Sequence, residues 1–281
     1  MTASYWNQKT VLVTGGSSGI GLAIARALAA RGAHVWLAAR RPELLETALA
    51  QVRAAAQHED QQFGFISVDL SDPQQAFAAC ETLIQQAGVP DVLINSAGAA
   101  HPGYVESLSP DIFHWMMDAN YFTTIHATKA VLPGMIARRS GQIVNISSAA
   151  GFLGVFGYTA YGATKFAIMG FSEALRAEMQ RHNIRVSIVY PSDTQTPQLD
   201  YENQFKPPET KAISGSASAL SAEQVAEVVL RQAARGRYSI FTSFDVRLFY
   251  LLNKFLPKAL VFAVLDGMAK MGQKNNQPSE A

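Results

Sequence analysis

Residues 10–21 read TVLVTGGSSGIG, and this stretch decides the fold of the chain. The apolar run 10–14 predicts a buried strand, and residues 18–31 place alanines and leucines at helical spacing. Glycines let the turn between them bend sharply, and the N-terminus of the following helix attracts negative charge. Since the turn joins a strand to a helix, we expect it to bind the pyrophosphate of a dinucleotide through Gly15, Ser17, Ser18, Gly19, Ile20 and Gly21.

The alternation of strand and helix continues along the chain. Further strands are predicted at 34–38, 63–68, 92–95, 142–147, 185–190 and 238–242, and helices at 42–56, 73–87, 110–137, 160–182 and 221–235. Near-continuous apolar strands between helices are typical of a parallel sheet that is covered on both faces. The sequence therefore predicts an α/β fold of the Rossmann type, a doubly wound parallel sheet of about seven strands.

The pattern changes after the strand at 185–190. Residues 193–218 are polar and contain three prolines, so they predict a long loop. Residues 243–271 are apolar and predict a helical extension that Pro257 interrupts, and the polar residues 272–281 predict a disordered tail. We expect a single domain over 1–242 that includes the 193–218 loop, with 243–271 as an extension of that domain.

Composition excludes several classes of protein. Among 281 residues, 48% are hydrophobic and 16% charged, which excludes disorder over most of the chain. The net charge of +1 leaves no basic footprint, so no nucleic-acid partner is expected. The single cysteine, Cys80, excludes a disulfide framework and a cysteine-rich zinc site. No basic stretch leads into an apolar run at the start, and no stretch of about 18 apolar residues occurs, so neither a signal peptide nor a membrane span is predicted.

The end of the second predicted strand bears on the choice of dinucleotide. An acid at this place would bind the ribose 2′-hydroxyl, but the chain has Ala38, Ala39, Arg40 and Arg41. Arginine binds a 2′-phosphate through paired charge-assisted hydrogen bonds. Arg40 and Arg41 therefore predict NADP(H) rather than NAD(H), the alternative being that both side chains are merely solvated.

Two further strand ends are expected to contact the cofactor. Asp69 and Leu70 follow the third strand, and Asp69 would accept a hydrogen bond from the adenine amino group or cap the next helix. Small residues follow the fourth strand and would let a flat ring lie against it. They predict contacts from Asn95, Ala97 and Gly98.

A tyrosine and a lysine share one face of the helix at 160–182. Tyr161 and Lys165 are four positions apart, and a neighbouring ammonium favours the phenolate, which otherwise forms only near pH 10. Ser148 lies at the end of the fifth strand, and Asn120 lies in the long helix before it. Each residue alone is uninformative, but the combination predicts a proton-transfer site.

These motifs together resemble the short-chain dehydrogenase/reductase family over residues 7–242, and Tyr161 follows Ser148 at the 13-residue spacing of that family. The resemblance implies that Tyr161 is the general acid, Ser148 orients the carbonyl, and Asn120 supports a proton-relaying water. It implies that Lys165 lowers the tyrosine pKa and holds the nicotinamide ribose. Hydride transfer in this family needs no metal. The resemblance also adds cofactor contacts from Tyr161, Lys165, Pro191, Thr194 and Thr196.

The chain departs from the family pattern at two positions. Ser96 replaces the second asparagine of Asn-Asn-Ala-Gly, and Ser192 replaces the glycine of a Pro-Gly pair. Because a flexible residue is lost at 192, the loop on the nicotinamide side is expected to start differently, and the assignment of Thr194 and Thr196 depends on that loop.

Residues 190–214 resemble one branch of the family, the 3-ketodihydrosphingosine reductases. The shared features are Asp193-Thr194, Thr196-Pro197, Glu202-Asn203, Lys206-Pro207 and Glu209-Thr210. The resemblance implies NADPH-dependent reduction of a long-chain 3-keto amino alcohol at the cytosolic face of a membrane. Alternatives are a reductase of another lipid or small ketone, such as a 3-oxoacyl thioester, and, more remotely, a non-catalytic nucleotide-sensing protein.

The 243–271 segment leaves its own alternatives open. Leu248, Leu251, Leu252, Phe255, Ala259 and Phe262 recur at helical spacing, accompanied by Lys254 and Lys258. This pattern is compatible with an interfacial membrane helix, a wall of an acyl-chain pocket, a subunit interface or a core-facing helix. We expect a cytoplasmic protein with peripheral membrane contact as one option. The family resemblance further implies a homodimer or homotetramer formed through the helices at 110–137 and 160–182.

Overall fold

A computed structural model of the chain describes residues 3–214 and 219–274. Its main element is a seven-stranded parallel sheet in the order β3-β2-β1-β4-β5-β6-β9. The strands are β1 (Thr10–Thr14), β2 (His34–Ala39), β3 (Phe63–Ser67), β4 (Val92–Asn95), β5 (Gly141–Ile146), β6 (Ile184–Tyr190) and β9 (Ser239–Phe241). The predicted Rossmann-type sheet is confirmed, and every predicted strand lies within two residues of its expected position.

Strand β1 lies at the point where the strand order reverses. Val13 pairs with Leu37 of β2 on one side and with Ile94 of β4 on the other. Successive side chains of β1 enter opposite layers: Val11 and Val13 pack in one core cluster and Leu12 in the other. A crevice opens beyond the carboxyl ends of the strands at such a reversal, and ligands bind there in open α/β sheets.

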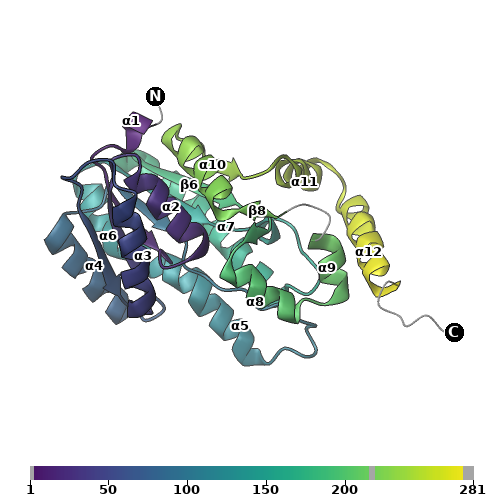
Figure 1. The fold of residues 1–281 in the computed structure, drawn as a ribbon. Helices are drawn as coiled ribbons and strands as arrows, with labels where there is room; N and C mark the ends of the chain where they lie inside the picture. The colour runs from purple at the N-terminus through teal and green to yellow at the C-terminus, as the bar shows by residue number, and fades with distance from the viewer. Residues whose placement is uncertain (1–2, 215–218, 275–281) are drawn as a thin grey trace.

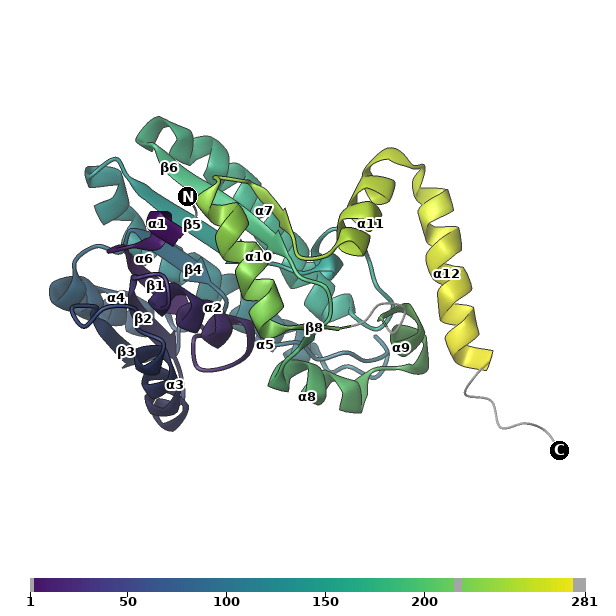
Figure 2. The same ribbon diagram turned by 45° about the horizontal axis from the view of Figure 1, so that its top comes forward.

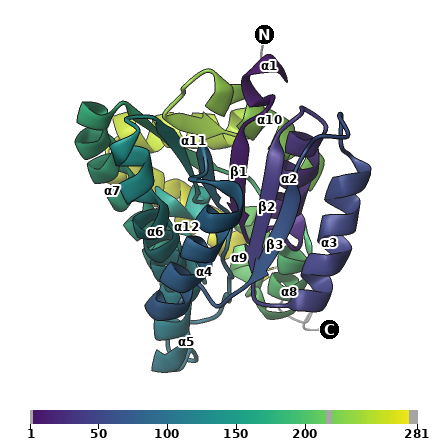
Figure 3. The same cartoon turned by 90° about the vertical axis from the view of Figure 1, so that its left-hand side faces the viewer.

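Helices cover both faces of the sheet, as Figure 3 shows. One layer consists of α2 (Gly19–Ala29), α3 (Pro42–Ala54) and α10 (Ala222–Ala234), which pack in the same cluster as Val11 and Val13. The opposite layer consists of α4 (Pro73–Ala87), α6 (Thr123–Ala137) and α7 (Thr159–Met179). Short helical segments complete this part of the fold: α1 (Ala3–Trp6), α5 (Pro110–Met116), η2 (Ala149–Gly151) and η3 (Gln180–His182).

The helix predicted over 110–137 is helical throughout but not uniform. A π-helical segment, η1 (Met117–Phe122), separates α5 from α6. Such segments arise when one extra residue is accommodated in a turn, and they are frequent at functional sites. Asn120 lies in this segment and is fully buried.

The prediction of a long loop over 193–218 is wrong for most of its length. The chain forms β7 (Thr194–Gln195), α8 (Pro197–Phe205) and α9 (Pro208–Ser214), and β7 pairs with β8 (Leu220–Ser221). Pro197 and Pro208 each occupy the first position of a helix, where proline is favoured because no partner is needed for its nitrogen. Residues 215–218 lie outside the described part of the chain.

The C-terminal segment forms two helices that extend from the body of the molecule (Figures 1 and 2). These are α11 (Phe244–Phe255) and α12 (Lys258–Lys274), separated near Pro257 as predicted. Helix α12 packs against α9. Residues 272–274, expected in a disordered tail, continue α12, and the rest of that tail, 275–281, lies outside the described residues. Within residues 3–214 and 219–274, no helix is long and apolar enough to cross a membrane.

Candidate active site

A cavity of about 490 Å³ opens beyond the carboxyl ends of the strands. Eighteen of the predicted site residues line it. They are Gly15, Ser17, Ser18, Gly19, Ile20, Gly21, Arg40, Arg41, Asp69, Leu70, Ala97, Gly98, Ser148, Tyr161, Lys165, Pro191, Thr194 and Thr196. Two predicted residues, Asn95 and Asn120, are buried behind the lining.

The glycine-rich turn takes its shape from backbone conformations that favour glycine. Gly15 and Gly19 have φ angles of 66° and 54°. A Cβ atom on Gly15 would lie 2.8 Å from the backbone of Ala97, so the two strand ends meet closely here. Ser18 is the N-cap of α2 but makes no side-chain capping bond in the described structure. The first amide groups of α2 are therefore suited to an anionic ligand.

The other predicted cofactor residues lie along the same side of the cavity. Arg40 and Arg41, both exposed, follow β2 and line the cavity edge. Asp72 caps α4 by accepting a hydrogen bond from the Gln75 amide at 3.0 Å, so Asp69 is not the cap of that helix. Asp69 Oδ1 instead accepts from Ser71, at 3.0 Å from its amide and 2.7 Å from its hydroxyl. This arrangement holds the Asp69 side chain at the cavity wall.

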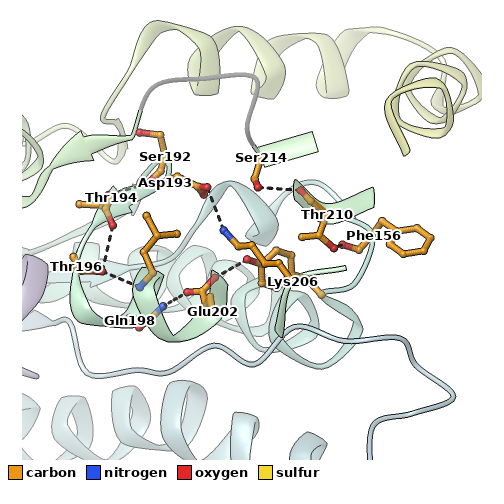
Figure 4. Close-up of polar contacts among 12 residues, drawn as sticks. Phe156, Ser192, Asp193, Thr194, Thr196, Gln198, Glu202, Lys206, Thr210 and Ser214 are labelled. Carbon is orange, nitrogen blue, oxygen red and sulfur yellow. Dashed lines mark hydrogen bonds and ion pairs between the residues drawn. The ribbon is translucent and has the colours of Figure 1, made fainter. Parts of the chain in front are cut away.

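Thr194 and Thr196, which follow β6, form a further part of the cavity rim. Their side chains are shown in Figure 4. Thr194 Oγ1 donates to Ser192 O at 2.8 Å, and Thr196 caps α8 by accepting from the Leu199 amide at 3.3 Å. A Cβ atom on Gly19 would lie 3.2 Å from Thr196 Cγ2, so this rim contacts the glycine turn. Ser192 lies outside the set of described residues with positive φ, which explains why serine is tolerated where glycine was expected.

Asn95 and Asn120 form hydrogen bonds with other protein groups and do not line the cavity. Asn95 Nδ2 donates to Thr128 Oγ1 at 3.0 Å and to Asn145 Oδ1 at 2.9 Å. Asn120 Nδ2 donates to Ala99 O and Met116 O, both at 2.9 Å, and its Oδ1 accepts from the Ala99 amide at 3.2 Å. Asn120 thereby ties the π-helical segment to the loop after β4. The predicted direct cofactor contact from Asn95 is not supported by this geometry.

Tyr161, Lys165 and Ser148 come together as the sequence predicted. Lys165 Nζ lies 5.5 Å from the centroid of the Tyr161 ring and donates to Ile146 O at 3.2 Å. Both side chains are buried, since α7 packs its first turns under the cavity. Ser148 caps η2, and its hydroxyl hydrogen-bonds to the Tyr161 phenol.

The pKa of Tyr161 differs from the expectation. Burial raises it, the charge of Glu202 raises it further, and the hydrogen bond from Ser148 opposes both. The expected lowering by Lys165 is not the outcome, because desolvation of the phenolate dominates. Burial also lowers the pKa of Lys165 to about 8, although the charge of Glu202 acts against this. At neutral pH the site therefore holds a protonated phenol beside an ammonium group, which suits proton donation.

Sequence reasoning assigned no role to several polar residues beside Tyr161. Tyr158, whose ring centroid lies 5.4 Å from that of Tyr161, donates through its hydroxyl to Glu202 Oε2 at 2.5 Å. Gln198 Nε2 donates to Glu202 Oε1 at 2.9 Å, and Lys206 Nζ lies 3.4 Å from Asp193 Oδ2 (Figure 4). Asp193, Glu202 and Lys206 belong to the branch motif in the sequence, but the motif gave no indication of these contacts.

Apolar side chains from outside the nucleotide-binding turns also line the cavity. They come from the segment before α7, from α9 and from the two C-terminal helices. The residues are Leu153, Val155, Ile213, Val246, Phe249, Leu265 and Met268. The cavity thus joins a polar nucleotide region to an apolar region, with Tyr161 in its lining.

A glycine turn at a helix N-terminus, arginines after β2 and a buried tyrosine–lysine pair define a dinucleotide-dependent oxidoreductase of the Rossmann class. Comparison with known proteins specifies the family. The model of the short chain dehydrogenase family matches residues 9–207, and the chain belongs to this family. The resemblance inferred from the sequence is therefore confirmed.

Curated relatives are similar over most of the chain. The 3-dehydrosphinganine reductase of Danio rerio is 41% identical over 237 residues, which cover 83% of this chain and 70% of the relative. The 3-ketodihydrosphingosine reductase of Bos taurus is 40% identical over 266 residues, covering 93% and 78%. Among solved structures, L-sorbose reductase from Gluconobacter frateurii, complexed with NADPH and L-sorbose, matches with a TM-score of 0.73 and 25% identity. The match covers 84% of this chain and 95% of that one.

Proposed function

We propose that this protein uses NADPH to reduce the 3-keto group of 3-ketodihydrosphingosine, giving dihydrosphingosine. The observation that carries the proposal is that one cavity is lined by the glycine turn, by Tyr161 and by an apolar wall. This wall suits a long acyl chain, and the polar end suits a dinucleotide. The substrate named for relatives at about 40% identity supports the same assignment.

The donor set of the cavity fits NADPH. The N-terminus of α2 supplies amide groups for the pyrophosphate, and Arg40 and Arg41 supply cations for a 2′-phosphate. The dinucleotide, when bound, supplies the hydride. The NADPH-bound sorbose reductase supports this choice. Of the four predicted catalytic residues, Tyr161, Lys165 and Ser148 lie where they can touch substrate or cofactor, whereas Asn120 acts through the backbone that it holds.

The chain's own residues then carry the proton. The Tyr161 hydroxyl donates to the carbonyl oxygen, and burial keeps this hydroxyl protonated at neutral pH. Ser148, bonded to the phenol, can donate to the same oxygen and hold it in place. The Lys165 ammonium, 5.5 Å from the ring centroid, stabilises the phenolate left after transfer and can hold the ribose hydroxyls.

The test is NADPH oxidation by the purified protein on two ketones. We expect turnover of 3-ketodihydrosphingosine to exceed that of a short-chain 3-oxoacyl thioester by about tenfold or more in kcat/KM, because only the long chain fills the apolar wall. Good activity on the thioester with none on the amino ketone would overturn the proposed substrate. No activity on either, together with tight NADPH binding, would favour a nucleotide-sensing role.

We further propose that α11 and α12 contact a membrane surface at the cytoplasmic side. Large apolar side chains on these helices are exposed, with Phe244 at 80% and Phe255 at 73% of their full accessible area. Exposed apolar patches of this kind mark interaction sites, and a helix with apolar and basic residues suits the bilayer interface. Vesicle co-sedimentation should show binding that Phe244→Ser and Phe255→Ser together reduce. Equal binding by both proteins would contradict the proposal.

We also propose a homodimer or homotetramer formed through α6 and α7. Phe122, next to α6, is 40% exposed and Phe166 of α7 is 39% exposed. Gly170 of α7 faces open space, which allows a second helix to approach closely. Light scattering after size exclusion should give a mass of twice or four times 30.4 kDa, and Phe166→Glu should lower it to that of one chain. A monomeric parent protein would refute this assembly.

A further inference from the structure

Glu202 is a buried carboxylate in the cavity wall next to the reacting groups. The residue is 7% exposed and lines the cavity together with Tyr158 and Tyr161. Its two hydrogen-bond donors, Tyr158 and Gln198, are both neutral. Figure 4 shows the contact with Gln198. None of the ion pairs within the described residues includes Glu202. A buried charge without an ion-pair partner is costly, so its retention in a binding cavity points to a ligand of opposite charge.

The neighbouring acid, Asp193, is in a different situation. Its Oδ2 lies 3.4 Å from Lys206 Nζ, and the Lys206 side chain is only 2% exposed. This pair is neutral overall. Glu202 has no such salt bridge within the described residues. Its charge acts on the Lys165 ammonium and on the Tyr161 phenol, and it raises the pKa of both groups.

We propose that the Glu202 carboxylate binds the ammonium group of a 2-amino-3-keto lipid and thereby selects amino ketones over ketones without an amine. This inference rests on the proposed function. In such a substrate the amine is on the carbon next to the carbonyl, so a carbonyl placed at Tyr161 brings the ammonium into the same region of the cavity. Each carboxylate oxygen of Glu202 accepts one hydrogen bond from protein and has capacity for another.

A second glutamate provides a matched control. Glu209 is 4% exposed, and it accepts hydrogen bonds from Tyr104 at 3.1 Å and from Gln273 at 2.9 Å. Like Glu202, it is buried and accepts from one tyrosine and one glutamine, but it is not among the residues that line the cavity. A merely structural glutamate is thus present in the same chain, and only Glu202 is placed to meet a ligand.

The test compares two substrates that differ only in the amine, 3-ketodihydrosphingosine and the analogue without its amino group. Glu202→Gln keeps the side-chain size and can keep both hydrogen bonds by rotation of the amides. We expect it to lower the ratio of kcat/KM values, amino ketone over analogue, by about tenfold or more, because the charge is lost. Glu209→Gln should leave the ratio unchanged. A ratio that Glu202→Gln does not move, or that both variants lower equally, would overturn the proposal.

A measurement on the unaltered protein covers the case in which Glu202→Gln does not fold. Octadecylamine and octadecanol share an alkyl chain and differ in the cationic head group. The amine should inhibit with an inhibition constant lower by about tenfold or more, and equal constants would count against an ammonium site. If the unaltered protein reduces other ketones but not 3-ketodihydrosphingosine, the proposed function fails. If it reduces that substrate and the ratio test is negative, only the role of Glu202 fails.

Discussion

Burial determines the protonation state of Tyr161, and thereby whether the residue can act as a proton donor. A phenol in water releases its proton near pH 10, and the pKa of Tyr161 is higher because the phenolate would be desolvated beside Glu202. The residue thus holds its proton at neutral pH, and a carbonyl oxygen that gains negative charge is a suitable acceptor. Burial therefore keeps Tyr161 in the protonated form, which is the form that can donate a proton to a carbonyl oxygen.

Replacement of Tyr161 tests the role of the phenol. Tyr161→Phe keeps the ring in its packing and removes the hydroxyl. We expect kcat to fall by about 10²–10⁴-fold, the usual contribution of a general acid. The dissociation constant of NADPH, measured by fluorescence titration, should stay within about threefold, because Lys165 remains in place. Tyr104→Phe, outside the cavity lining, should leave kcat unchanged. Turnover by Tyr161→Phe close to that of the unaltered protein would refute the assignment.

The preference for NADPH over NADH is expected to depend on the arginines after β2, and Arg40 tests this. Arg40→Ala should weaken NADPH binding by about tenfold or more, since a charge-assisted contact with the 2′-phosphate is lost. NADH lacks this phosphate, so its dissociation constant should change little. Isothermal titration with both nucleotides measures the difference, and Arg53→Ala, on α3 away from the cavity lining, is the control. Equal losses for the two nucleotides would contradict a 2′-phosphate role.

The lowered pKa of Lys165 predicts that kcat/KM for NADPH decreases at alkaline pH. Its pKa is lowered to about 8, so the side chain is an ammonium below that pH and neutral above it. A neutral amine binds the ribose hydroxyls less strongly and does not stabilise a phenolate. We expect kcat/KM for NADPH to be level below pH 7.5 and to fall by about tenfold per pH unit well above pH 8, from the loss of one proton. In Lys165→Met this pH dependence should disappear, leaving a low constant value. If kcat/KM of Lys165→Met still falls above pH 8, another group causes the fall and the prediction is wrong.

At the scale of elements, the π-helical segment η1 depends on one side chain. Asn120 makes hydrogen bonds with three backbone groups, the amide and carbonyl of Ala99 and the carbonyl of Met116. Asn120 is fully buried, so water cannot reach these three backbone groups to replace its hydrogen bonds. The loop after β4 and the α5–α6 region are positioned relative to each other by this residue.

Removal of these bonds should be measurable as a loss of stability. Asn120→Ala is expected to lower the free energy of unfolding by about 2–4 kcal/mol, because buried backbone groups are left without partners. Ser221→Ala removes the capping box at the N-terminus of α10 and should cost only about 1 kcal/mol. Urea titration followed by circular dichroism compares the two. A smaller loss for Asn120→Ala than for Ser221→Ala would show that η1 does not depend on its asparagine.

The elements also show where sequence reasoning succeeds and where it does not. Strand and helix alternation follows from local hydrophobic pattern, and α4 and β4 lie at their predicted bounds. The 193–218 region was expected to be a loop because prolines interrupt it, yet Pro197 and Pro208 begin helices. Local pattern also cannot reveal the bond between Tyr158 and Glu202, which are 44 positions apart. The candidate cofactor residues could be predicted because they follow predicted strands. The residues on the substrate side could not, because they are brought together by contacts between segments far apart in the sequence.

At the scale of the whole molecule, cofactor binding should be coupled to stability. The residues proposed to bind NADPH follow β1, β2, β3, β4 and β6 or lie in α7, so a bound dinucleotide would contact the carboxyl ends of the central strands. A ligand at 100 times its dissociation constant stabilises the native state by about 2.7 kcal/mol. For a chain of this size we expect the Tm to rise by about 5–10 °C with NADPH. Differential scanning calorimetry measures this, and NADH at the same concentration should raise the Tm less.

Helix α12 packs on α9 near the end of the described chain, where a Cβ atom on Gly272 would lie 2.6 Å from Pro208 O. Helix α9 and α12 both contribute to the apolar cavity wall, through Ile213 and through Leu265 and Met268. Protein synthesis is vectorial, and N-terminal parts of a chain can fold while the rest is still on the ribosome. The nucleotide side of the cavity can therefore assemble on the nascent chain, but the wall facing the substrate cannot close until residue 268 has been released. The residues proposed to bind the cofactor, 15–196, are thus all synthesised before those that enclose an acyl chain.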